Sequence, residues 1–365
     1  MTRRAFHSCT FIINPSRYPE YSKILKKILK RIEVPILIES ESREHFMDSV
    51  REFCRNHHAH LLVWGGDGTA HDAINVLTEE MLKNPEIRAK KSVGFLRGGS
   101  GNGIQDSYEV PLGIRKQVQI YAESMENNFV IDVDLLEATH GGKAAYCQLV
   151  GIGLDAQSLN ERAKKVYKRG KQKGRIKKGF NVYLTSFLTT FLRKYEQIQK
   201  ELDIKLYRGK YAFKGTRVNA ELPFDYLERK TKSVEIEAGS RPYYGRLFKV
   251  CPDVVCNDGY LDLYIYNFEN RLSMLQNAYW LWCGRHDRIN KKFAKDKKPL
   301  IERYEIEEVQ ICSQEPFDYH LDGESATTDQ KIDGQYTIDI KVLPRQLGFL
   351  VPAAFYRKFH PFESL

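Results

Sequence analysis

Two hydrophobic patterns divide this chain of 365 residues into an N-terminal and a C-terminal part. Before about residue 133, short apolar runs alternate with segments such as 21–32 and 43–57, where apolar residues recur every three or four positions. This order predicts buried parallel strands joined by right-handed helical crossovers, which is a three-layer α/β domain. We expect the apolar stripe of the first helix to face the core: Ile24, Leu25, Ile28, Leu29 and Ile32.

After about residue 133, apolar and polar residues alternate between turns, as in segments 129–138, 234–239 and 260–268. A period of two indicates strands with one buried face, so we expect an antiparallel β-sandwich. The predicted organisation is an α/β domain of residues 1–133, completed by about 345–365, and a β-rich domain of residues 134–344.

Composition fits a folded protein that lies inside the cell. The chain is too long for one ordinary core, and 42% of its residues are hydrophobic. Its seven cysteines include no CxxC pair, which argues against structural zinc and for a reducing compartment. We see no signal peptide, and no apolar run approaches the ~20 residues that span a bilayer. We therefore expect a cytoplasmic protein that is soluble or peripherally membrane-associated.

The net charge of +10 is concentrated in one segment, because residues 162–178 contain ten Lys or Arg and no acid. A solvated basic face is one interpretation of this run. Nucleic acid is a second, although no nucleic-acid-binding module is recognised elsewhere. An anionic membrane surface is the third, worth roughly 1 kcal/mol for each basic residue close to the lipid.

Candidate chemistry begins with a glycine-rich segment, Gly65 to Thr69, which follows an apolar strand and precedes a helix. Backbone N–H groups of such a loop can converge on phosphate, and the helix N-terminus adds positive potential. Asp67 would repel phosphate unless it binds Mg²⁺ or takes a proton from an attacking hydroxyl. The segment therefore predicts part of a phosphoryl-transfer site, with a plain strand-to-helix turn as the alternative.

A second strand at residues 93–97 also runs into glycines, at positions 98, 99, 101 and 103, with Ser100 and Asn102 between them. Asn14, Ser40 and Gly65 fall at the carboxyl ends of three predicted strands, where α/β sheets bind ligands. Two such turns after two strands are far more specific than one.

These motifs resemble the diacylglycerol kinase catalytic family, which includes sphingosine kinases, ceramide kinases and bacterial lipid kinases. GGDGT at 65–69 resembles the family signature, while GSGN at 99–102 and His71 are similar to sphingosine kinases. The resemblance continues in family order through GIGLDAQ at 151–157, the DG–LD run near 258–262, HLDGE at 320–324 and KVLPRQLGFLVP at 341–352.

The chain departs from the family pattern at three points. NPSRYPE at 14–20 lacks the glycine expected after the serine, Gly103 replaces an aspartate, and Ala238 stands where asparagine is frequent. These departures keep open a catalytically silent, lipid- or nucleotide-binding relative of the same fold.

The resemblance implies an active site in the cleft between the two domains, with ATP and Mg²⁺ as cofactors. Asp67 and Glu324 are the candidate catalytic carboxylates, and the sequence does not decide which one lies closer to the acceptor hydroxyl. The residues expected to contact nucleotide are Asn14, Pro15, Ser40, Gly65, Gly66, Asp67, Gly68, Thr69, His71, Ser100, Gly101, Asn102, Arg162 and Asp322.

Three further acids have a functional and a structural interpretation. Asp155 is expected to contact the lipid head group or to cap the following helix. Asp258 is expected to bind a structural Mg²⁺ or to sit in a plain turn. Asp322, before Gly323, fits a hairpin turn as well as a nucleotide contact.

The resemblance also implies a lipid substrate that carries a hydroxyl, either a sphingoid base or diacylglycerol. An anionic membrane surface is the expected partner, nucleic acid is not expected, and a homodimer is an open possibility. An apolar stripe near the lipid entrance fits core packing first and a membrane-facing helix second: Tyr183, Phe187, Leu188, Phe191 and Leu192.

Overall fold

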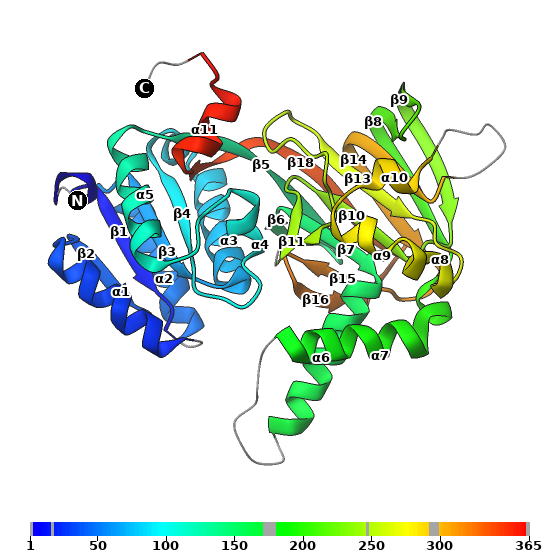
Figure 1. Ribbon diagram of the computed structural model, residues 1–365, viewed down its shortest axis with the longest axis horizontal. Coiled ribbons are helices and arrows are strands. Elements are labelled where there is room, and N and C mark those ends of the chain that lie inside the picture. The colour runs from blue at the N-terminus through cyan, green and yellow to red at the C-terminus, as the bar shows by residue number, and fades with distance from the viewer. Residues whose placement is uncertain (1–2, 16–17, 171–179, 246–247, 292–298, 363–365) are drawn as a thin grey trace. The chain divides into compact units, whose positions relative to one another are not determined.

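The structure of the protein is a computed structural model that describes residues 3–15, 18–170, 180–245, 248–291 and 299–362. Side chains are described within these ranges except at 3–4, 165–170 and 180–184. The chain forms two compact units, Met1–Asp134 with Arg345–Leu365, and Leu135–Pro344. It passes from the first unit to the second within β5 (Val130–His140) and returns within β18 (Gln335–Leu350) (Figure 1).

The first unit contains the predicted parallel sheet, in the order β2-β1-β3-β4 followed by the end of β18. Each neighbouring pair is parallel, and the pairing with β18 runs through Gly348 and Phe349. All of β1 and most of β3 are buried, so both faces of the sheet are covered. The four N-terminal strands are β1 (Cys9–Ile13), β2 (Ile36–Glu39), β3 (His60–Gly65) and β4 (Ser92–Arg97).

Helices cover this sheet in two pairs, since α1 contacts α5 and α2 contacts α3. The stripe predicted for α1 is narrower than expected: Leu25 and Leu29 are fully buried, whereas Ile24 is 48% exposed because it lies at the edge of the covered face. The helices of this unit are α1 (Pro19–Arg31), α2 (Arg43–Arg55), α3 (Asp67–Lys83), α4 (Gly103–Ser107), α5 (Ile114–Glu126) and α11 (Ala353–Phe359), with 3₁₀ turns at Arg3–Phe6 and Pro85–Lys90.

The second unit is built from antiparallel strands, as the alternating pattern predicts. Its main path is β16-β15-β7-β10-β13-β14-β18, and β14 also pairs along its other edge with β8, which pairs with β9. The strands are β6 (Lys143–Cys147), β7 (Leu149–Gly153), β8 (Leu202–Lys214), β9 (Asn219–Thr231), β10 (Glu235–Gly239), β11 (Tyr243–Gly245), β12 (Phe248–Lys249), β13 (Leu261–Tyr266), β14 (Ile301–Ser313), β15 (Asp318–Leu321), β16 (Glu324–Thr327) and β17 (Lys331–Ile332).

Apolar side chains from β5 to β8, β10, β13, β14 and β18 share one buried core in this unit. A second core lies between the sheet and helices that include α7, α9 and α10. The helices of the second unit are α6 (Leu154–Gly170), α7 (Phe180–Ile198), α8 (Arg271–Gln276), α9 (Ala278–Trp282) and α10 (His286–Ile289).

The apolar stripe expected on α7 divides between core and solvent. Phe191 is buried and Phe187 packs against the same core, whereas Leu188 and Leu192 are 47% and 57% exposed. The side chain of Tyr183 lies outside the described residues, as does most of the basic run at 162–178. Among the described helices, none combines the length and apolar character needed to cross a membrane.

Candidate functional site

Four strand ends of the first unit carry the residues that the sequence singles out. Asn14 follows β1, Ser40 follows β2, Gly65 ends β3, and Gly98 follows β4. The loop after β3 is shorter than predicted, because α3 begins at Asp67 and takes Gly68 and Thr69 into its first turn. Asp67 therefore lies at a helix N-terminus, where the macrodipole stabilises a negative side chain.

The two glycine-rich segments pack directly against each other. Gly98 donates its N–H to the Gly65 carbonyl over 2.8 Å. A Cβ atom on Gly99 would lie 2.4 Å from the Gly66 Cα atom, a distance that real side chains do not tolerate. Glycine is thus needed at Gly99 so that the two backbones can approach, in addition to any contact with a ligand.

Asp67 binds the second glycine segment through its carboxylate. Its two oxygens accept the backbone N–H groups of Asn102 at 2.8 Å and Gly103 at 2.6 Å. A Cβ on Gly101 would stand 2.3 Å from the same carboxylate. This geometry gives Asp67 a structural part in holding the two loops together, and its catalytic role stays a prediction.

The side chain of Asn102 closes the turn formed by residues 99–102. Its backbone is left-handed, with φ of 62°, a conformation that asparagine adopts more readily than most residues. The side-chain oxygen accepts the Gly99 N–H at 3.0 Å, and the side-chain amide donates to the Gly99 carbonyl at 2.9 Å. Ser100 and Gly101 are the two residues enclosed by this turn.

The ends of β1, β2 and β3 are joined by further hydrogen bonds. The Asn14 amide donates to the Thr69 hydroxyl at 3.0 Å, and Ser40 donates both its N–H and its hydroxyl to the Ile13 carbonyl. His71 is buried on α3, with Asn75 3.3 Å from its Nε2. The structure therefore brings together the residues predicted on this edge: Asn14, Pro15, Ser40, Gly65, Gly66, Asp67, Gly68, Thr69, His71, Ser100, Gly101 and Asn102.

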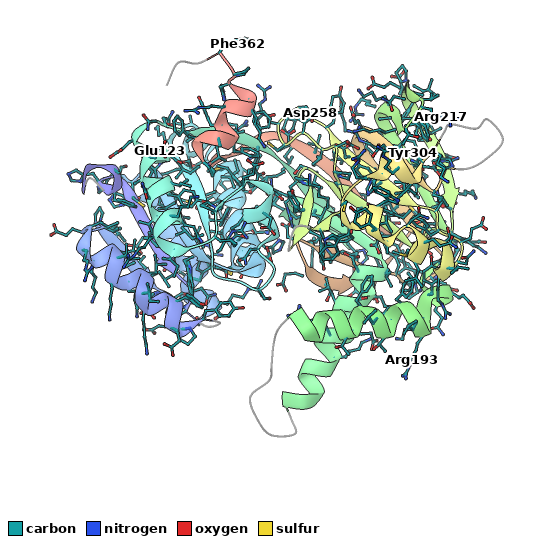
Figure 2. The ribbon with its side chains drawn as sticks, viewed as in Figure 1. Glu123, Arg193, Arg217, Asp258, Tyr304 and Phe362 are labelled. Carbon is teal, nitrogen blue, oxygen red and sulfur yellow. The ribbon has the colours of Figure 1, made fainter. Side chains whose placement is uncertain are left out.

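The other predicted residues belong to the second unit. Asp155 and Arg162 lie on α6, and Glu324 is exposed at the start of β16. Asp258 is exposed near the surface of its unit (Figure 2), and its carboxylate accepts the Tyr260 N–H at 3.1 Å, a turn contact. The expected cleft between the units and the expected Mg²⁺ at Asp258 stay predictions.

Asp322 lies in the left-handed turn between β15 and β16, with φ of 50°. Its carboxylate contacts the guanidinium of Arg241 at 3.0 Å, and both side chains are essentially inaccessible to solvent. It also accepts the Gln148 N–H at 3.2 Å. Removing one partner would leave a buried unpaired charge, so the pair gives Asp322 a structural role beside any nucleotide contact.

A cluster of three acids and one histidine occupies the interior of the second unit; Asp155, Glu235, Glu237 and His320 are called the acidic–histidine cluster below. All four are at most 8% exposed. His320 Nε2 lies 2.5 Å from Asp155 Oδ2 and 4.0 Å from Glu237 Oε1. Glu235 accepts the Asp155 N–H at 3.0 Å.

Strand register explains how the cluster forms. On β7, Gly151 pairs with Glu237 of β10 on one side and with His320 of β15 on the other. The three residues therefore form one row across the sheet, and Gly151 leaves the space that the two larger side chains use. A Cβ on Gly151 would lie 2.3 Å from His320 Nε2.

The acids of this cluster differ in how readily they ionise. Burial works against ionisation of Asp155, but the charge of His320 and its hydrogen bonding hold the pKa of Asp155 below its usual range. Burial, and then the charge on Asp155, raise the pKa of Glu235 and of Glu237 well above the usual range. These directions favour the charged form of Asp155 and the protonated form of the two glutamates.

A match to a known protein family covers most of the first unit. A family model described as the diacylglycerol kinase catalytic domain matches residues 9–137. This part of the chain belongs to the diacylglycerol kinase catalytic domain family. The matched range of this catalytic domain includes both glycine-rich segments and Asp67.

Solved structures resemble the chain well beyond the catalytic domain. A diacylglycerol kinase structure from Bacillus anthracis str. Sterne is 17% identical, covers 95% of this chain and 97% of its own, and has a TM-score of 0.57. Two further structures from the same strain have TM-scores of 0.61 and 0.59 at 17% and 19% identity. At this identity the likeness shows the fold alone. A search of curated proteins gives no significant match.

The acidic–histidine cluster, outside the matched catalytic domain, is the group of described side chains best placed to hold a metal ion. Ligand atoms of Asp155, Glu237 and His320 lie within 4.8 Å of one another. However, the Gly323 N–H points at His320 Nδ1 over 3.3 Å. A metal on Nε2 would require a proton on Nδ1, against Gly323. Buried His320 Nε2, Asp155 Oδ2 and Glu237 Oε2 have no hydrogen-bond partner within the described residues, so the cluster stays a candidate metal centre.

Sequence reasoning missed Glu235, Glu237 and His320 as members of a site. A signal was present, because Glu235 and Glu237 are two positions apart in a strand and so share one face. Their apolar neighbours, Val234, Ile236 and Ala238, show that the strand is buried on its other face as well. Two acids in such a strand predict a buried polar cluster.

Proposed function

We propose that the protein is an ATP- and Mg²⁺-dependent lipid kinase that phosphorylates a hydroxyl of a sphingoid base or of diacylglycerol. The match of residues 9–137 to the diacylglycerol kinase catalytic domain carries this proposal. The paired glycine-rich segments support it, since they lie at strand ends beside the N-terminus of α3, a position that suits phosphate groups.

In this proposal the acceptor oxygen attacks the γ-phosphorus, the bond to the β–γ bridging oxygen breaks, and ADP leaves. Mg²⁺ would neutralise charge on the phosphates. The acceptor proton passes to Glu324, which is exposed, whereas Asp67 already accepts two backbone N–H groups. Arg162 is assigned to phosphate, and Asp155, held by His320, to the lipid head group.

A catalytically silent relative is the alternative. The altered segment at 14–20 and Gly103 in place of the family's aspartate favour it. Such a protein would bind nucleotide or lipid without turnover. For either version we propose a cytoplasmic protein that meets its lipid at an anionic membrane surface.

Incubation of the full chain with labelled ATP, Mg²⁺ and a panel of sphingoid bases, ceramide and diacylglycerols tests the proposal. Labelled lipid supports the kinase, and nucleotide binding without any lipid product supports the silent relative. Glu324→Gln should lower kcat by at least about a hundredfold if it is the general base, with ATP affinity unchanged. Glu221→Gln, which changes an exposed acid of the same unit on β9, is the matched control and should keep full activity.

A further inference from the structure

Helices α8 and α9 expose an unusual concentration of large apolar side chains. Within eleven residues, Leu272, Leu275, Tyr279, Trp280 and Trp282 are exposed by 64%, 57%, 68%, 36% and 50%. Clustered aromatic and aliphatic groups of this size are uncommon on a surface that faces only water. We call these five residues the α8–α9 surface.

The opposite side of the same helices is packed in the normal way. Leu281 is buried and Met274 packs against the second core of the unit. The helical path continues through Asn277, whose carbonyl accepts the Leu281 N–H at 2.9 Å. Because the spacing of Leu272, Leu275, Tyr279 and Trp282 is three, four and three residues, the exposed side chains follow one side of the path.

The composition of the α8–α9 surface is that of a membrane interface. Tyrosine and tryptophan combine an apolar ring with one polar group, and they concentrate at the level of lipid head groups. Two leucines one turn away supply aliphatic groups that can enter the acyl boundary.

Basic residues surround this surface. Arg271, Arg285 and Arg288 have side chains 39%, 48% and 52% exposed, Lys291 is exposed, and Arg193 projects from the neighbouring helix α7 (Figure 2). Arg271 lies 3.7 Å from Glu196, and Asp287 lies 3.0 Å from Arg285 and 3.9 Å from Arg288, so three arginines share two acids. Anionic lipid would be attracted to this rim.

We propose that the α8–α9 surface docks on an anionic lipid bilayer. Leu272, Leu275, Tyr279 and Trp282 enter the interface, and the surrounding arginines contact lipid phosphates. This contact is separate from the basic run at 162–178. The purpose of this contact rests on the proposed function. The enzyme would use the α8–α9 surface to reach a lipid substrate that stays in the membrane.

Tryptophan fluorescence gives a direct readout, because two of the three tryptophans lie in α9 and the third, Trp64, is 1% exposed. The full chain is mixed with phosphatidylcholine vesicles that contain or lack phosphatidylserine. We expect a blue shift and quenching by lipids brominated on their acyl chains, both stronger with phosphatidylserine. An emission that no vesicle changes would overturn the proposal.

The variant Leu275→Asn/Tyr279→Ser removes two of the most exposed members of the surface. Vesicle binding by co-sedimentation should weaken on the order of tenfold or more, since about 1.4 kcal/mol of lost apolar burial is tenfold. Leu222→Asn on β9, where the leucine is 53% exposed, is the matched control and should bind like the wild type. Equal binding by the double variant would refute the assignment.

Two further measurements distinguish docking on lipid from self-association and from an effect on catalysis. If the double variant loses self-association in light scattering while vesicle binding is unchanged, the surface joins two copies and the proposal is wrong. Phosphorylation of a short-chain, water-soluble lipid should be the same for the double variant and the wild type. If no lipid is phosphorylated by either protein and vesicle binding still depends on the surface, the proposed function fails and the docking stands.

Discussion

Gly151 is the residue on which the acidic–histidine cluster depends most directly. Gly151→Ala would place a methyl group 2.3 Å from His320 Nε2, so the histidine or the strand must shift. We expect a loss of about 1–3 kcal/mol in the free energy of unfolding, measured by urea denaturation. Lipid kinase activity should fall further than the loss of stability accounts for, because Asp155 loses its partner.

Ser158→Ala, on α6 next to the cluster, provides a comparison for that measurement. It removes only a hydroxyl that donates to the Leu154 carbonyl, so kinase activity should stay close to that of the wild type. A Gly151→Ala protein with normal stability and normal activity would show that the row of Glu237, Gly151 and His320 is unimportant.

His286 predicts a pH dependence of stability. It is buried against the rings of Tyr264 and Tyr266, and no hydrogen bond to either nitrogen is found within the described residues. Burial lowers its pKa from 6.5 to about 4, although Asp253 and Asp287 oppose the change. Between these values the unfolded chain binds a proton that the folded protein does not, so this residue lowers stability as the pH falls.

His286→Phe should therefore become more stable relative to the wild type as the pH is lowered from 7 to 4. Each unit of the pKa difference corresponds to about 1.4 kcal/mol at the acidic end of this window. Urea denaturation at several pH values measures the difference. A difference that stays constant with pH would contradict the assignment of a neutral buried histidine.

At the level of secondary-structure elements, the two glycine-rich segments depend on each other because their backbones are in contact. Gly99→Ala would bring a methyl group to 2.4 Å from the Gly66 backbone, which has no flexible side chain to move. We expect ATP affinity to drop at least about tenfold and stability to fall by about 1–3 kcal/mol. Isothermal calorimetry and urea denaturation measure the two effects.

Ser100→Ala is the control within the same turn. It leaves the backbone contact between the segments in place and removes one hydroxyl. Its stability should stay within about 0.5 kcal/mol of the wild type. If Gly99→Ala binds ATP as well as the wild type, close approach of the two backbones is not required for the site.

The elements themselves could be predicted from the sequence to a large extent. Apolar runs and period-two alternation located most strands, because burial on one face or two imposes those patterns. Boundaries were less accurate, because α3 starts at Asp67, inside the segment predicted as a loop. Strand β9 was not predicted, since none of its residues before Thr231 is buried, and Phe224 and Leu227, which pack against the core, are three positions apart rather than two.

The sites were predictable only where one segment carries the signal. Both glycine-rich segments could be found, since the pattern of glycines is local. The acidic–histidine cluster could not be assembled, because β7, β10 and β15 meet only through strand pairing. Exposure of Ile24, or of Leu188 and Leu192, depends on what packs above each helix, which helical spacing alone does not reveal.

At the scale of the whole molecule, the first unit is completed by residues 345–365, which follow the second unit in the sequence. Phe349 of β18 pairs with β4 and packs its ring 5.4 Å from Phe95 and 4.8 Å from Tyr108. Val351 donates its N–H to the Phe129 carbonyl, and its own carbonyl accepts the Ser124 hydroxyl. The tail therefore contributes a strand and part of the core to the N-terminal sheet.

A fragment of residues 1–134 should consequently fail to fold cooperatively, because β4 would expose its edge and its apolar face. Circular dichroism during thermal unfolding should show no sharp transition. The same fragment joined by a flexible linker to residues 345–365 should regain one. A cooperative transition in the fragment without the tail would show that the C-terminal strand is dispensable.

The passage of the chain out of the first unit and back also bears on how the protein is synthesised. A ribosome synthesises residues 345–365 only after every residue of the second unit. The second unit can thus complete its fold while the first still waits for its final strand. We expect the nascent N-terminal sheet to be the part that most needs a chaperone, and its glycine-rich segments to settle only after residues 345–365 have joined the sheet.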